Sequence, residues 1–177
     1  MTMNVASIAP RESATSHVDL ISPVPDAWGP RMWAWLREDP EANFDDFGPQ
    51  TLAEFMAERA ALRGQERLWG VMCDGEPCGY IQFLPITSML GTMHLCFARA
   101  VHGRGIATDA LRRIREELVA DGIEKLLITF FADNLRVEQF CRGFGAVDEG
   151  LFRHHTRTHG RLRDVRVMAV FAHQSGA

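Results

Sequence analysis

Apolar residues recur along the chain with two spacings, and each spacing predicts a different kind of element. Helical spacing predicts amphipathic helices over 28–38 and 108–120, together with one that begins after Thr51 and one that begins after Asn134. Thr51 is the expected N-cap of its helix, because Glu54 three residues later completes a capping box. Runs rich in apolar residues predict strands at 17–22, 68–73, 79–84, 92–98, 126–131, 151–158 and 163–171.

The order of these elements predicts the class of fold. Strands alternate with helices, and the last two strands form a hairpin around His159 and Gly160. We therefore expect an α/β fold in which helices flank a mixed, mostly antiparallel twisted sheet. The 177 residues contain no internal repeat and suit a single domain, which we expect over 17–172. Residues 1–16 are polar and small, and we expect them to form a flexible N-terminal segment.

Composition sets the broad class of the protein. Hydrophobic residues make up 46% of the chain and charged residues 24%, which is ordinary for a globular protein in water. No apolar run reaches the roughly 18 residues that a bilayer-spanning helix needs, so no membrane partner is expected. The segment 1–16 lacks the basic start and apolar centre of a signal peptide, which predicts a cytoplasmic location.

Cysteine usage and net charge narrow the partners further. We expect the four cysteines as thiols, although Cys73 and Cys78 flank a predicted turn, where a cross-strand disulfide is the alternative. No Cys or His group has zinc spacing, so no metal is expected. The net charge of −4 does not favour nucleic acid as a partner. Both a monomer and a homodimer stay open.

Charge is uneven along the chain, because residues 150–166 hold five arginines and three histidines against one aspartate. One interpretation is a hairpin with a solvated basic face. The other is a surface that meets an anionic partner, such as an acidic peptide or RNA.

A glycine-spaced turn opens directly into the helix over 108–120, and it reads His102-Gly103-Arg104-Gly105-Ile106-Ala107. Such a turn presents free main-chain N–H groups at the positive end of a helix dipole, which is where proteins bind phosphate. Two familiar phosphate loops do not fit these residues. The P-loop needs a Lys-Ser or Lys-Thr pair, which the chain lacks, and the dinucleotide fingerprint needs glycine where Thr108 stands.

The turn instead resembles the acyl-coenzyme A loop of the GNAT superfamily of N-acetyltransferases, with histidine in the first slot of the pattern. The resemblance continues downstream, where Asn134 begins a run through Ala146 that has the spacing of the next conserved helix of that superfamily. Cys141 stands there where the superfamily usually has tyrosine. The closing stretch over 149–169 is similar to the ribosomal-protein N-acetyltransferase branch. The resemblance covers about residues 65–171.

The resemblance implies a fold of the GNAT type and an acetyl-CoA cosubstrate, from which an acetyl group passes to a primary amine. The acceptor would be a protein N-terminus, a peptide or a small amine. The pantetheine arm would lie where the strand over 92–98 splays from the strand over 126–131. The implied cofactor-binding residues are Cys96, Phe97, Ala98, His102, Gly103, Arg104, Gly105, Ile106, Ala107 and Asn134.

Three residues are candidates for the chemistry of acetyl transfer. Cys141 is a candidate acid for the leaving thiolate, and its alternative role is to pack in an apolar stripe. His94 is a candidate base because its ordinary pKa of about 6.5 suits the task, and its alternative role is structural. Asn134 is a candidate for the cleft and for capping the helix that follows it. Asp133 and His155 are weaker candidates.

Two other functions remain open. The loop recognises coenzyme A and not the acyl group, so a different acyl group is an alternative. A non-catalytic acyl-CoA-binding module is the other, since histidine at 102 and cysteine at 141 depart from the usual pattern.

Overall fold

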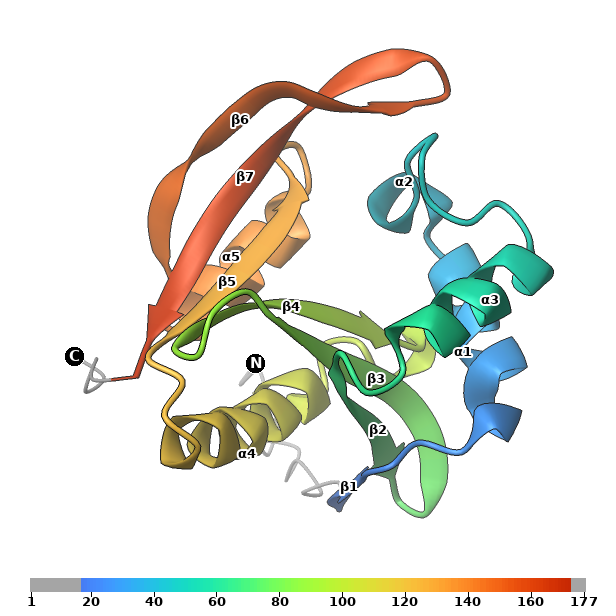
Figure 1. Cartoon of the computed structure of the whole chain (residues 1–177), viewed down its shortest axis with the longest axis vertical. Helices are drawn as coiled ribbons and strands as arrows, with labels where there is room; N and C mark the ends of the chain where they lie inside the picture. The colour runs from blue at the N-terminus through green and yellow to red at the C-terminus, as the bar shows by residue number, and fades with distance from the viewer. Residues whose placement is uncertain (1–16, 173–177) are drawn as a thin grey trace, which may run out of the picture.

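The computed structural model describes residues 17–172, so the expected flexible segment 1–16 lies outside the described residues. The seven predicted strands are present, and the four predicted helices appear as α1, α3, α4 and α5 (Figure 1). The elements are β1 (Val18–Ile21), η1 (Asp26–Trp28), α1 (Gly29–Arg37), α2 (Pro40–Asn43), α3 (Leu52–Leu62), β2 (Arg67–Cys73), β3 (Glu76–Pro85), β4 (Leu90–Phe97), η2 (Arg99–Val101), α4 (Ile106–Ala120), β5 (Lys125–Phe131), α5 (Leu135–Gly143), β6 (Val147–Thr158) and β7 (Arg161–Phe171).

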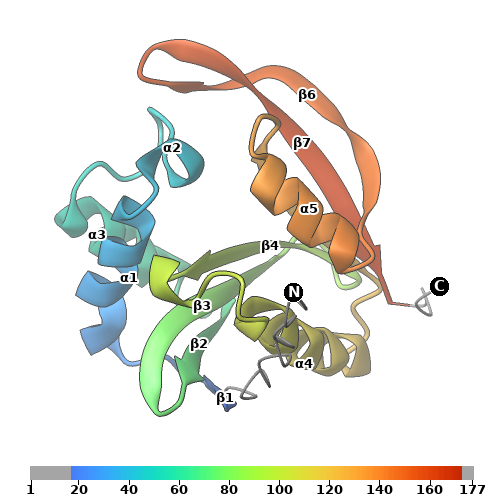
Figure 2. The same ribbon diagram turned by 180° about the vertical axis from the view of Figure 1, so that it is seen from behind.

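The strands form one sheet in the order β1-β2-β3-β4-β5-β7-β6. Every neighbouring pair is antiparallel except β4 and β5, which run parallel. This arrangement confirms the predicted mixed, mostly antiparallel sheet. The parallel pair is possible because α4 crosses over between β4 and β5 (Figure 2).

Helices cover both faces of the sheet, and a separate part of the core lies on each. The larger part packs α4 and α5 against one face, which Figure 2 shows with both helices in front. The smaller part packs α1 and α3 against the other face, over β3 and β4. The larger core includes Val71, Ile81, Phe83, Met93, Ile106, Leu111, Ile114, Leu118, Ile128 and Met168, and the smaller core is Met32, Trp35, Phe55, Tyr80 and Cys96.

A local prediction about a helix end is confirmed. The Thr51 side chain accepts a hydrogen bond from the Glu54 N–H, and the Glu54 carboxylate accepts one from the Thr51 N–H, which completes the capping box. Gly122 follows α4 with a φ of +88°, the left-handed conformation that glycine adopts most readily. The short helix α2 was not predicted, because its four residues are too few to show a helical period.

The β6–β7 hairpin reaches across the molecule to the segment before α3, as Figure 1 shows. The Asp46 carboxylate accepts hydrogen bonds from the N–H groups of His159 and Gly160, at 2.7 and 2.9 Å. The Thr156 hydroxyl donates to the Asp45 carboxylate at 2.8 Å. These contacts fix the far end of the hairpin against the α2 side of the molecule.

The structure divides the basic residues of the hairpin into two groups. Arg163 and Arg166 are used internally: Arg163 pairs with Asp133, and Arg166 pairs with Asp148. The other three arginines, 153, 157 and 161, are exposed, and their side chains make no ion pair or hydrogen bond within residues 17–172. The two interpretations of this basic segment therefore both stay open.

Candidate functional site

The sheet opens between β4 and β5. Their parallel ladder runs from Leu90 opposite Lys125 to Met93 opposite Ile128, and it ends there. Both strands continue, β4 to Phe97 beside β3 and β5 to Phe131 beside β7. The main-chain groups on their facing edges are therefore left without each other as partners. This opening is the splay that the sequence predicted.

Main-chain geometry decides which groups of β4 face the splay. The Ala98 N–H donates to the Cys78 carbonyl at 2.9 Å, on the β3 side. Because successive residues of a strand direct their main-chain groups to opposite neighbours, Leu95 and Phe97 direct theirs toward the splay. Leu95 was not among the predicted residues, because a main-chain contact leaves no mark on the residue type.

The predicted phosphate loop lies at the end of β4, after η2. Gly103 and Gly105 both have left-handed backbones, with φ of +75° and +79°. No atom lies within 4 Å of where a Cβ would stand at either glycine, so the loop is open on its outer side. Gly105 is the N-cap of α4 and supplies no side-chain cap for the first turn of this helix.

The N–H groups at the start of α4 are available to an anion. The first main-chain hydrogen bond of the helix runs from the Asp109 N–H to the Gly105 carbonyl at 3.0 Å. The N–H groups of Gly103, Gly105, Ile106 and Ala107 have no partner among the described residues. The Arg104 N–H differs, because it donates to the Val101 carbonyl at 3.4 Å. The loop thus presents a cluster of donors at the positive end of the α4 dipole.

Both polar side chains of the loop have protein partners. The Arg104 guanidinium lies 3.3 Å from the Asp74 carboxylate, which belongs to the turn between β2 and β3. His102 lies 3.1 Å from the Phe97 carbonyl through Nε2, and 3.1 Å from Arg136 through Nδ1. Arg136, on α5, was not predicted to take part in the site.

His94 lies on β4 opposite Gln82 of β3, just beyond the last residue of β4 that pairs with β5. Its side chain is exposed, yet enough protein surrounds the ring for desolvation to lower its pKa from the ordinary histidine value. Its ring is therefore neutral near pH 7, which is the form that accepts a proton. Beside it, Gln82 donates to Glu66 at 2.5 Å, and Glu66 forms an ion pair with Arg59.

Cys96 lies two residues from His94 and on the same face of the strand. It is 6% exposed and packs beneath α1 in the smaller core. Burial, with a smaller contribution from the Glu38 carboxylate, raises the pKa of its thiol to about 12. The two neighbours therefore differ: His94 is accessible and Cys96 is not.

Cys141 lies on α5 with no exposed surface, inside the larger core. Burial first, and then the nearby Glu138 carboxylate, raise the pKa of its thiol to about 11. Both properties favour the packing role that the sequence left open beside the acid role.

Asn134 caps α5, because its Oδ1 accepts a hydrogen bond from the Val137 N–H at 3.2 Å. Its Nδ2 has no partner within residues 17–172. Asp133 is paired with Arg163, whose guanidinium also lies 3.8 Å from the centre of the Phe131 ring. His155 lies on the hairpin, with its ring 5.0 Å from that of Phe152.

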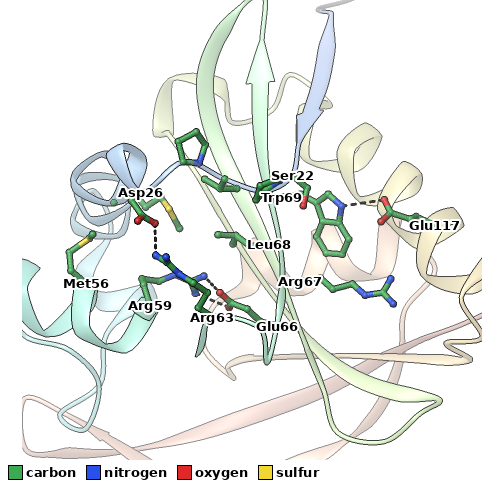
Figure 3. Close-up of a pocket in the computed structure, with 16 residues that line it drawn as sticks. Ser22, Asp26, Met56, Arg59, Arg63, Glu66, Arg67, Leu68, Trp69 and Glu117 are labelled. Carbon is green, nitrogen blue, oxygen red and sulfur yellow. Dashed lines mark hydrogen bonds and ion pairs between the residues drawn. The ribbon is translucent and has the colours of Figure 1, made fainter. Parts of the chain in front are cut away.

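A pocket of about 400 Å³ lies elsewhere, between the segment after β1, α3 and the start of β2 (Figure 3). Four of its charged groups pair with one another: Arg63 donates to Asp26 at 2.6 Å, and Arg59 pairs with Glu66. None of the candidate catalytic or cofactor-binding residues lines it. We therefore assign no chemistry to this pocket.

Three further properties bear on the site. All four cysteines are thiols, so the alternative of a Cys73–Cys78 disulfide is not formed. Within residues 17–172, no group of three or more His, Cys, Asp or Glu side chains is arranged to hold a metal ion. No helix in the described part of the chain is both long and apolar enough to cross a membrane.

Comparison with known proteins places these features in a family. Residues 29–146 match the model of the Acetyltransferase (GNAT) family. No curated protein matches the chain. Among solved structures, the Salmonella typhimurium acetyltransferase that modifies the N-terminal serine of ribosomal protein L7/L12 has a TM-score of 0.75 at 16% identity, covering 90% of this chain and 96% of its own.

Two other structures share this fold. A chimera of spermidine N-acetyltransferase SpeG from Vibrio cholerae and hSSAT has a TM-score of 0.77 at 15% identity, covering 88% of this chain and 95% of its own. The Salmonella typhimurium protein yncA, solved with its cofactor acetyl-CoA, has a TM-score of 0.71 at 13% identity, covering 92% of this chain and 97% of its own. At these identities the likeness establishes the fold and not the acceptor.

Proposed function

Because the chain belongs to the acetyltransferase (GNAT) family, we propose that it is an N-acetyltransferase that moves an acetyl group from acetyl-CoA to a primary amine. The amine is a protein N-terminus, a peptide or a small molecule. We further propose that residues 17–172 act as one domain. The cytoplasmic location stays a prediction.

One observation carries this proposal: unpaired main-chain donors at 103, 105, 106 and 107 stand at the open end of the β4–β5 splay. A diphosphate needs such donors, and an extended amide-containing arm needs free strand edges. The two features lie next to each other along the chain, with η2 between them. Coenzyme A has both parts, and its pantetheine arm and its diphosphate are adjacent in the molecule, as the splay and the loop are in the chain.

Acetyl-CoA supplies an activated thioester, whose carbon–sulfur bond breaks as the amine nitrogen bonds to the carbonyl carbon. The loop of residues 102–107 would hold the pyrophosphate. The main-chain groups of Leu95 and the N–H of Phe97 would hold the pantetheine arm, because the Phe97 carbonyl already contacts His102. The free Nδ2 of Asn134 is a further donor at this edge. Positioning the amine against the thioester in this way lowers the barrier without any charged catalyst.

We assign His94 as the base that takes a proton from the incoming ammonium. It lies where the β4–β5 ladder ends, and it is accessible. Its lowered pKa keeps the ring neutral and ready to accept a proton at neutral pH.

We assign Cys141 a packing role and take water as the source of the proton for the leaving thiolate. Cys141 has no exposed surface through which a cofactor thiolate could approach its thiol, whereas solvent can reach a leaving thiolate in the splay. Burial also raises the pKa of this thiol to about 11, which makes it a weaker acid than an ordinary thiol.

The experiment is release of free thiol from acetyl-CoA, followed with a panel of amines that includes peptides, polyamines and amino acids. Turnover with at least one primary amine, and an acetylated product by mass spectrometry, are expected. Binding of acetyl-CoA without turnover on any acceptor would instead support the non-catalytic module. Turnover only with a longer acyl-CoA would support the alternative acyl group.

A further inference from the structure

A chain of polar contacts crosses the cofactor side of the splay. It starts at Asp39, where the carboxylate accepts a hydrogen bond from Arg136 Nη2 at 3.0 Å. The other terminal nitrogen of Arg136 lies 3.1 Å from His102 Nδ1, and His102 Nε2 lies 3.1 Å from the Phe97 carbonyl. The contacts join the end of α1, the start of α5, the phosphate loop and the end of β4.

The hydrogen-bond partners fix the state of His102. The Phe97 carbonyl only accepts, so Nε2 carries the proton. The Arg136 guanidinium only donates, so Nδ1 is the accepting nitrogen. His102 is therefore neutral in this arrangement, and Arg136 is the cation of this chain of contacts.

Glu38, the residue before Asp39, also reaches the cofactor side. Its carboxylate accepts a hydrogen bond from the Arg99 N–H at 2.5 Å, at the start of η2. Two neighbouring acids at the end of α1 thus hold both sides of the splay, one through η2 and one through α5.

The Asp39–Arg136 pair is accessible to solvent and easily exchanged. The side chains are 30% and 54% exposed, respectively. Ion pairs with such exposure contribute little to stability, so a stronger partner can readily replace the carboxylate. A phosphate offers the guanidinium two oxygens and more charge, which makes it the stronger partner.

Building on the proposed function, we propose that Arg136 is a phosphate ligand of coenzyme A and that Asp39 is its placeholder. In the ligand-free protein the Asp39 carboxylate occupies the guanidinium edge that a phosphate oxygen takes on binding. Arg136 already touches the first residue of the phosphate loop, so a rotation of its side chain suffices. Asp39 therefore competes with the cofactor for Arg136, and Arg136 attracts the cofactor phosphate.

The test is calorimetric titration with coenzyme A itself, which carries the phosphates and needs no acceptor. Asp39→Asn removes the competing charge and is expected to tighten binding several-fold. Arg136→Gln is expected to weaken binding by about tenfold or more, because one charge-assisted contact with a phosphate is lost. Arg142→Ala is the matched control, since Arg142 is an exposed arginine on the same helix that pairs with Glu138, and it should bind as the unaltered protein does.

The outcomes separate this inference from the proposed function. If the unaltered protein does not bind coenzyme A, the proposed function fails. If it binds, and Asp39→Asn weakens binding or Arg136→Gln leaves it unchanged, the roles of these two residues are wrong. Thermal unfolding of each variant without ligand checks the fold. Arg136→Lys keeps the positive charge but loses the forked guanidinium, so its Kd for coenzyme A is expected to lie between those of the unaltered protein and Arg136→Gln.

Discussion

The thiol of Cys141 has no exposed surface, and its neighbours in the core come from α4 and the sheet as well as from α5. We predict that Cys141→Ala lowers the free energy of unfolding by about 1 kcal/mol, because it leaves a small cavity. The kcat should stay within a factor of about two, since no proton passes through this residue. Chemical denaturation and steady-state kinetics measure the two effects.

A loss of about 10²-fold in kcat with coenzyme A binding unchanged would instead make Cys141 the acid. Asn134→Ala serves as a comparison, because it removes the cap of α5 and one proposed cofactor donor together. It should lower stability by about 1 kcal/mol and also raise the Kd for acetyl-CoA.

His94 is the residue whose role depends most on pH. Desolvation lowers its pKa below 6.5, so the ring stays neutral as the pH falls until that lowered pKa is reached. We predict that kcat/KM for the unaltered protein falls on the acid side of its pH profile, below pH 6.5, where His94 gains its proton. The measurement is the pH dependence of kcat/KM for one acceptor, compared with His94→Gln.

In His94→Gln that fall on the acid side should be absent, and kcat/KM at pH 7 should be about 10² to 10⁴ lower. His159→Gln is the control, because His159 lies in the hairpin turn and pairs with Glu41. A profile that is the same in the unaltered protein and in His94→Gln would remove His94 from the mechanism.

At the scale of elements, the phosphate loop depends on backbone conformation as much as on residue type. Gly105 has a φ of +79°, and its outer side is open. We predict that Gly105→Val abolishes acetyl-CoA binding, because a branched side chain would stand where phosphate oxygens approach the N–H groups. Calorimetry or a thermal-shift titration measures the binding.

The control for this change is Gly122→Val, at the other end of α4. Gly122 has a φ of +88° and equally open surroundings, so valine introduces similar backbone strain there. This variant should lose stability and still bind acetyl-CoA. Normal binding by Gly105→Val would mean that the loop is assigned wrongly.

Elements whose signals are local were predicted well. The capping box at Thr51 depends on two residues that lie three positions apart, and it is present. The splay was predicted from the resemblance of the loop and of the helix after Asn134. The short helix α2 was missed because four residues carry no period.

Contacts between distant segments could not be predicted from the sequence. Asp39 and Arg136 are 97 positions apart, and neither residue type is unusual at its place in a helix or loop. The same holds for the contacts of Asp46 with the hairpin turn, across 113 positions. The exposure of His94 and the burial of Cys96 also depend on where α1 lies over the sheet, which hydrophobic spacing does not specify.

At the scale of the whole molecule, the overall charge of −4 gives no general attraction for an anionic cofactor. Attraction must therefore be local, through the α4 dipole, the loop N–H groups and Arg136. Within residues 17–172, the sheet serves this arrangement by placing its one parallel strand pair, at which the strands splay, beside the loop. Cofactor binding should consequently stabilise the folded molecule as a whole.

The most direct test of this account is the thermal unfolding midpoint, measured with increasing acetyl-CoA. A ligand at 100 times its Kd that binds only the folded state contributes about 2.7 kcal/mol, which for a protein of this size raises Tm by about 5–10 °C. We predict a rise of this order for the unaltered protein and none for Gly105→Val. No change in Tm for the unaltered protein at millimolar acetyl-CoA would contradict the assignment of the loop and, with it, the proposed acetyl transfer.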